Sequence, residues 1–178
     1  DVAKKSACHA VKFQTFKAIE IVQDQSLMFT YFTQGKKISE SMYKMFKRYE
    51  LKEKNWNIIS NYCRKKKIIF FSTPQNISDL NILIKLNVPA IKVGSDDFTN
   101  VGLIKNYLKH KIPLILSTGM STKDDIKRVL NIKGISKKKV IFLLCTSEYP
   151  TNHESVNINK FNNLKKILKN YSIGFSDH

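Results

Sequence analysis

The amino-acid sequence predicts an α/β fold of the (β/α)8 barrel class, of which this chain would form about six of the eight strands. Three observations lead to this prediction. There are six short apolar runs, helix-like segments lie between them, and most runs follow one another at roughly the 20–30-residue step of a strand–helix unit. The apolar runs are residues 10–16, 68–74, 90–95, 114–120, 140–147 and 172–178.

These runs predict strands that are buried on both faces. Their β-branched and aromatic residues are continuous rather than alternating with polar ones, which is typical of a parallel sheet covered by helices. Residues 24–39 are polar and mixed, and we expect an ordered excursion or lid there. Thr122 and Asp125 have the spacing of a capping box at a helix start. Other helices are predicted at residues 40–50, 53–66, 78–86, 101–110 and 157–169.

Two lysines favour a barrel over an open doubly wound sheet. Lys12 and Lys92 each lie inside an apolar run. A barrel has an interior whose upper layer can hold polar catalytic groups, whereas a sheet covered on both faces by helices has none. An alternative is that both lysines extend along the barrel rim into solvent.

The composition argues against several classes of protein. The formal net charge is +17, but only Arg48, Arg64 and Arg128 are arginines, and nucleic-acid sites favour arginine, so we expect no nucleic-acid partner. No apolar stretch approaches membrane-spanning length, and no signal peptide is visible. The cysteines Cys8, Cys63 and Cys145 are scattered, which predicts reduced thiols and a cytoplasmic protein.

Active sites of (β/α)8 barrels lie at the carboxyl ends of the strands. The polar residues at the predicted strand ends are mainly cations and hydroxyls, without the paired glutamates of glycosidases. Lysines and converging hydroxyls suit a phosphate and a carboxylate. The set comprises Lys12, Gln14, Ser72, Thr73, Lys92, Ser95, Ser117, Thr118, Thr146, Ser147, Tyr149, Ser176, Asp177 and His178.

Successive motifs of the chain resemble those of the N-acetylneuraminate (sialic acid) synthase family, which includes legionaminic and pseudaminic acid synthases. The resemblance covers nearly the whole chain, and the motifs come in the family's order. They are VKFQTFK (11–17), FSTP (71–74), VPAIKVGSDDFTN (88–100), PLILSTGMST (113–122), LLCTSEYPT (143–151) and GFSDH (174–178).

The resemblance implies a transferase that condenses phosphoenolpyruvate with the open-chain aldehyde of an N-acyl amino sugar, giving a nine-carbon 2-keto sugar acid and phosphate. The sugar would be N-acetylmannosamine or a bacterial diacetamido-trideoxy hexose. A divalent metal, Mn²⁺ or Mg²⁺, would polarise the aldehyde oxygen. The family also implies a homodimer for the full-length protein.

The resemblance assigns roles by motif. Gln14, Asp97 and Tyr149 would face the amino sugar or order the site around it, and together with Lys12 they form the predicted catalytic set. His178 would be one metal ligand. Phosphoenolpyruvate would be held by Lys12, Thr73, Lys92, Ser95, Ser117, Ser147 and Ser176.

The chain also departs from the family pattern. Asp96 stands where members usually have glycine, and a carboxylate there could weaken the anion site. The family's first strand, with a catalytic glutamate, is absent, as are the last strand, with a second metal histidine, and the antifreeze-like C-terminal domain. We therefore expect residues 1–178 to be one partial catalytic barrel that is inactive in isolation.

Less specific interpretations stay open at this stage. Thr73 and Ser117 could simply cap the following helices, and Asp177 could support a metal-bound histidine or be a turn residue. Cys145 is predicted to be a core residue without chemistry. The chain as a whole could instead be a Schiff-base barrel aldolase, an inactive fragment or a basic binding module.

Overall fold

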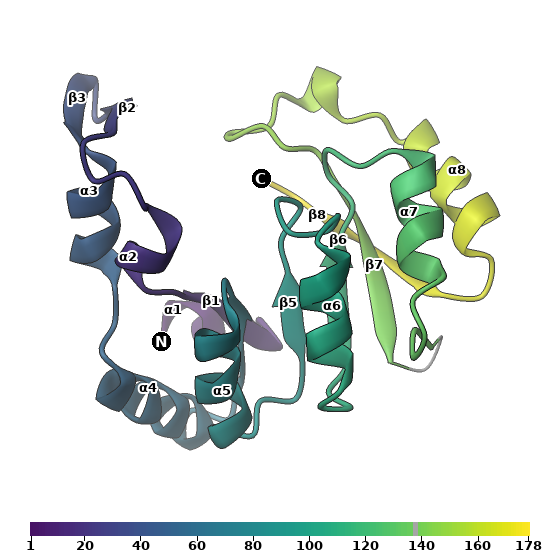
Figure 1. Ribbon diagram of the computed structural model, residues 1–178, viewed down its shortest axis with the longest axis horizontal. Coiled ribbons are helices and arrows are strands. Elements are labelled where there is room, and N and C mark those ends of the chain that lie inside the picture. Colours follow the sequence, from purple (N-terminus) through teal and green to yellow (C-terminus); the bar gives the residue numbers. More distant parts are fainter. Residues whose placement is uncertain (137–138) are drawn as a thin grey trace. The chain divides into compact units, whose positions relative to one another are not determined.

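A computed structural model describes residues 1–136 and 139–178, which divide into two compact units (Figure 1). The N-terminal unit comprises Asp1–Phe70 and Pro74–Leu86, and the C-terminal unit comprises Phe71–Thr73 and Asn87–His178. Strand β4 (Ile69–Pro74) thus contributes to both units.

The C-terminal unit is a parallel sheet with helices between its strands. Its elements are β5 (Ile91–Val93), α6 (Val101–Leu108), β6 (Leu114–Ser117), α7 (Lys123–Leu130), β7 (Val140–Cys145), the 3₁₀ turn η1 (His153–Ser155), α8 (Asn159–Leu168) and β8 (Ser172–Ser176). Phe142 is fully buried and its ring meets those of Phe98 and Tyr171 edge-on, at centroid distances of 6.4 and 5.3 Å. Burial of such large rings provides much of the hydrophobic stabilisation of this unit.

The N-terminal unit contains the first strand, a hairpin and three longer helices. Its elements are α1 (Val2–Lys5), β1 (Ala10–Thr15), α2 (Ala18–Ile21), β2 (Met28–Thr33), β3 (Lys36–Ser41), α3 (Met42–Tyr49), α4 (Glu53–Lys65), the ends of β4, and α5 (Ile77–Lys85). Phe13 packs against Trp56 and Phe70, with ring centroids 6.0 and 5.5 Å apart. None of the helices in residues 1–136 and 139–178 is long and apolar enough to cross a membrane.

All six predicted strands are present, and their hydrogen-bonded order is β1-β4-β5-β6-β7-β8. The pairs from β4 to β8 are parallel. The amide of Ile69 donates to the His9 carbonyl, and the amide of Gln75 donates to the Thr15 carbonyl. The donor and acceptor are the same number of residues apart in both bonds, so β1 and β4 are also parallel. The prediction of adjacent parallel strands in sequence order is therefore confirmed, but the six strands do not close into a barrel.

Helices α5 and α7 begin with reciprocal capping hydrogen bonds. The Thr122 side chain accepts a hydrogen bond from the Asp125 amide, and the Asp125 carboxylate accepts one from the Thr122 amide, so the predicted capping box is confirmed. Asn76 and Asp79 form the same arrangement at the start of α5. Each reciprocal pair satisfies amides that a helix end would otherwise leave without partners.

The segment predicted as an excursion forms an antiparallel hairpin, which the sequence analysis missed. Strands β2 and β3 pair Thr33 with Lys36 across a two-residue turn. Gln34 and Gly35 both have positive φ, 48° and 73°, as a type I′ turn requires. The helix expected from residue 40 begins at Met42, because residues 40 and 41 end strand β3 and Ser41 caps the helix.

Candidate active site

The strand register of the C-terminal unit brings one polar side chain per strand to a common face. Residues paired across a parallel ladder point the same way, and side chains alternate along each strand. Ser72 pairs with Ile91, Lys92 with Ile115, Ser117 with Leu143 and Cys145 with Ser176. It follows that one sheet face carries Thr73, Lys92, Ser117, Cys145 and Ser176 near the carboxyl ends of the strands.

Lys92 is the buried cation of this face. Its side chain is only 6% exposed, and the ammonium donates to the Val93 carbonyl at 2.8 Å and to the Ser117 hydroxyl at 2.5 Å. A lysine that extends along a rim would carry its ammonium into solvent. The burial of Lys92 contradicts that alternative for this lysine. A desolvated ammonium instead provides a strong field for an anion.

Ser95, Gly119 and Ser147 form the hydroxyl-rich part of the site. The Gly119 amide donates to the Ser95 hydroxyl at 3.1 Å. A Cβ atom on Gly119 would lie 2.5 Å from the Ser147 Oγ and 2.6 Å from the Ser95 Oγ, so both hydroxyls approach the glycine more closely than any side chain would allow. The loops that carry Ser95, Gly119 and Ser147 thus meet where Gly119 lacks a side chain.

Thr73 and Ser117 do not cap the following helices, which disproves that interpretation. Helix α5 is capped by Asn76 and α7 by Thr122. Thr73 and Ser117 are instead buried, at 2% and 3% exposure, in the sheet. Their positions are determined by the strands, as the predicted site requires.

Cys145 lies inside the site, although the sequence analysis gave it no chemistry. The Ser95 hydroxyl donates to its Sγ at 3.5 Å, and the Sγ lies 3.9 and 4.0 Å from the two ring nitrogens of His178. The apolar residues around Cys145 obscured its orientation. Strand alternation was the signal that could have revealed it, because Cys145 lies two residues after Leu143 on the face that also bears Ser117.

The ring of His178 is held in one tautomer. Its Nδ1 lies 2.9 Å from the Thr146 carbonyl, which only accepts, so Nδ1 carries a proton and the neutral form of the ring has its lone pair on Nε2. The hydroxyls of Ser176 and Tyr149 lie 3.2 and 3.3 Å from Nε2. Tyr149 also stacks on the imidazole, with ring centroids 4.2 Å apart.

This tautomer suits a metal ligand. A histidine that binds a metal through Nε2 usually donates its other N–H to a carbonyl or carboxylate, and His178 does so. Within residues 1–136 and 139–178, however, no group of three histidine, cysteine or acidic side chains is arranged to hold a metal ion. The described residues therefore fit a divalent cation with one ligand and do not supply a complete set.

Two adjacent carboxylates differ in environment. Burial, and then the charge of Asp96, raises the pKa of Asp97, while a hydrogen bond from Asn100 opposes the rise. Asp96 is exposed, and its carboxylate folds back over Gly94, where a Cβ atom would collide with it. Desolvation, and then the nearby Cys145 and Asp96, raises the pKa of Tyr149, which keeps its hydroxyl protonated as a donor toward His178.

Lys12 and Gln14 belong to the N-terminal unit. Val11 and Phe13 of β1 line a cavity together with Ile59 of α4. Because side chains alternate along a strand, Lys12 and Gln14 lie on the other face of β1, away from this helix. Lys12 is exposed there, as is Gln14. Lys12 therefore lies on the face of β1 away from α4, and its exposure leaves the rim interpretation open for this lysine.

Comparison with known proteins identifies the family and several relatives of this chain. The model of the NeuB family matches residues 1–178. An uncharacterised protein of Methanocaldococcus jannaschii is 35% identical over 99% of this chain and 48% of its own length. The N,N'-diacetyllegionaminic acid synthase of Campylobacter jejuni is 30% identical over 100% of this chain and 54% of its own length.

A solved structure shows the same arrangement. The N-acetylneuraminic acid (sialic acid) synthetase of Leptospira borgpetersenii superposes with a TM-score of 0.83 at 27% identity, over 99% of this chain and 56% of that protein. The chain spans about half the length of the curated relatives it matches. Since the family model covers every residue, the chain belongs to the NeuB family.

Proposed function

We propose that this chain is the greater part of the catalytic (β/α)8 barrel of a synthase that condenses phosphoenolpyruvate with an N-acyl amino sugar. The observation that carries the proposal is the buried Lys92 ammonium, hydrogen-bonded to Ser117 beside the hydroxyls around Gly119. A fixed cation and converging donors suit a ligand with both a phosphate and a carboxylate. The names of the relatives favour this chemistry over a Schiff-base aldolase.

In this proposal the residues of the site have different roles. Thr73, Lys92, Ser95, Ser117, Ser147 and Ser176 hold the phosphate and carboxylate of phosphoenolpyruvate. Asp97 and Tyr149 orient the amino sugar, and Cys145 supports Ser95 and His178. The roles expected for Lys12 and Gln14 stay predictions.

The reaction would form one carbon–carbon bond and break one bond to phosphate. The enol carbon of phosphoenolpyruvate attacks the sugar aldehyde, water adds at the carbon that bears the phosphate, and phosphate leaves to give the 2-keto acid. His178 would be one ligand of a Mn²⁺ or Mg²⁺ ion, which polarises the aldehyde oxygen. The remaining ligands would come from outside the described residues.

The proposal includes the protein's larger organisation. We propose a cytoplasmic homodimer whose barrel is completed by further strands. The 178 residues alone would show no synthase activity, because the sheet has open edges at β1 and β8 and a single imidazole rarely holds a divalent ion against solvent.

The test combines the chain with the flanking segments of the Campylobacter jejuni relative. The completed protein is incubated with phosphoenolpyruvate, Mn²⁺ and either N-acetylmannosamine or a diacetamido-trideoxy hexose. We expect phosphate release together with a nine-carbon 2-keto acid, detected by mass spectrometry, and no product from the 178-residue chain. Borohydride trapping of pyruvate on Lys92 would instead indicate Schiff-base chemistry.

A further inference from the structure

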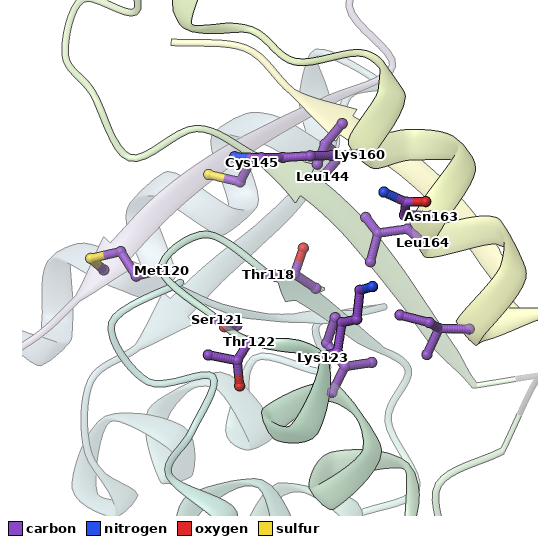
Figure 2. A pocket seen from close by; sticks show the side chains of 12 residues that line it. Thr118, Met120, Ser121, Thr122, Lys123, Leu144, Cys145, Lys160, Asn163 and Leu164 are labelled. Atoms are coloured by element: carbon purple, nitrogen blue, oxygen red, sulfur yellow. The ribbon is translucent and has the colours of Figure 1, made fainter.

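A cavity of about 400 Å³ lies between helices α7 and α8 of the C-terminal unit (Figure 2). Side chains line it from α7 and the loop before it, and from the end of β7 and α8. Its volume falls in the range of small-molecule sites in proteins. Of its lining residues, only Cys145 has a role in the proposed synthase site.

The floor of the cavity is apolar. Ile126 of α7, Leu144 of β7 and Leu164 of α8 line it and are at most 7% exposed in the folded chain. Leu144 lies on the helix-covered face of β7, whereas Cys145, which also lines the cavity, directs its Sγ toward Ser95 in the candidate active site. The apolar floor is therefore on the helix-covered side of the sheet, and the cavity adjoins the candidate active site at Cys145.

The rim is positively charged. Lys123 comes from α7 and Lys160 from α8, and both are exposed. Across residues 1–136 and 139–178, neither ammonium makes a hydrogen bond or ion pair. The acidic residues of α7 are engaged elsewhere, since Asp124 pairs with Lys127 and Asp125 caps the helix through Thr122.

No acidic residue lines the cavity in the part of the chain that the structure describes. Two cations on opposite helices therefore face the mouth without a local counter-charge, above an apolar floor. Asn163 of α8 adds an amide that can donate or accept a hydrogen bond. This combination selects a molecule with an anionic end and a compact apolar body, and disfavours a fully hydrated inorganic anion.

We propose that this cavity binds a small organic anion. Its carboxylate or phosphate lies between Lys123 and Lys160, and its apolar body packs on Ile126, Leu144 and Leu164. The inference does not depend on the synthase reaction, because it involves no residue proposed to bind phosphoenolpyruvate or the sugar.

The test uses a reporter that the cavity itself provides. Met120 lines the mouth and is 72% exposed, so its ¹³C-labelled methyl group gives a sharp NMR signal, assigned by Met120→Leu. The probe is 2-naphthoate, a rigid aromatic carboxylate. Typical ligand efficiencies give a Kd of about 1 mM for a ligand of this size, and we expect a saturable shift of the Met120 signal in that range.

Matched variants distinguish binding of the probe in the cavity from general electrostatic attraction to a basic protein. Lys123→Gln/Lys160→Gln should weaken binding roughly tenfold, whereas Lys105→Gln/Lys166→Gln, with the same net charge, should leave it unchanged. Lys105 and Lys166 are exposed lysines that do not line the cavity. Asn163→Phe, an exposed rim change, should block the mouth. The neutral 2-naphthamide should bind more weakly.

Two results would overturn the proposal. One is a Met120 signal that does not respond to millimolar 2-naphthoate in the folded protein. The other is equal weakening by both lysine pairs, which would mean that the net charge of the protein, rather than the cavity, attracts the probe.

Discussion

Replacing Lys92 by methionine removes a buried charge and keeps most of the side-chain volume. Lys92 is 6% exposed, and its ammonium donates to the Val93 carbonyl and the Ser117 hydroxyl. Loss of one charge-assisted contact to phosphoenolpyruvate costs about 1.5–3 kcal/mol. We therefore expect the Kd for phosphoenolpyruvate to rise roughly ten- to hundredfold.

The same change should affect stability much less. Methionine avoids the desolvation cost of the ammonium, but the Val93 carbonyl and Ser117 hydroxyl lose a donor. These opposing contributions are each about 1–3 kcal/mol, so the melting temperature should move by only a few degrees. The difference between a large loss of affinity and a small change in stability is what distinguishes a binding residue from a structural one.

The assay is isothermal titration calorimetry with phosphoenolpyruvate at fixed ionic strength, together with thermal melting followed by circular dichroism. Lys105→Met, on the exposed side of α6, removes the same charge away from the site. Affinity within twofold of the unmodified protein for a folded Lys92→Met variant would refute the assignment of Lys92 to the anion site. So would an equal loss of affinity in Lys105→Met, because the effect would then reflect net charge.

Three further predictions test the surroundings of this lysine. Gly119→Ala should lower phosphoenolpyruvate affinity about tenfold or more by displacing two hydroxyls, whereas Gly102→Ala, whose Cβ would meet nothing closer than 3.6 Å, should bind normally in the same titration. In a Cys8→Ser background, phosphoenolpyruvate should slow alkylation of Cys145 by iodoacetamide, measured by mass spectrometry; an unchanged rate would place the ligand elsewhere. Burial, and then Glu20, raises the pKa of Asp79 from 3.8 to about 6, which costs about 2–3 kcal/mol of stability above pH 6 and nothing below pH 4. Asp79→Asn should therefore raise the melting temperature at pH 8 but not at pH 4, and equal effects at both pH values would contradict this reasoning.

The strands could be predicted because their apolar residues form continuous runs in the sequence. A run such as residues 140–145 has no polar position, and the structure buries Val140, Phe142 and Leu144 on one side of β7. Ile141, on the other side, is 38% exposed, so the predicted burial on both faces is wrong for this strand. The hairpin at residues 28–41 gives a weaker signal in the sequence. Its side chains are mostly exposed, so the strongest signal was the Gln34-Gly35 turn inside a polar segment.

The site was predicted only in part, for a related reason. Hydroxyls and lysines at strand ends stand out against apolar neighbours, and the structure brings Lys92 and Ser117 within hydrogen-bonding distance. Cys145 does not stand out, because a thiol is a common core residue. Its proposed role depends on the face of β7 that it occupies. Alternation from Leu143 indicates this face, and the pairing with Ser176 on β8 confirms it.

Register explains why adjacent hydroxyls at one strand end have different roles. Ser117 pairs with Leu143 and points to the face of Lys92, whereas Thr118 uses both its amide and its hydroxyl to donate to the Leu143 carbonyl, at 3.0 and 2.9 Å. Thr118 therefore ties the end of β6 to β7 and fixes the position at which Ser117 meets the ammonium. A slip of one residue would exchange the two side chains and move the polar group to the helix-covered face. The precision of the anion site thus depends on a hydrogen bond made by a residue that does not take part in it.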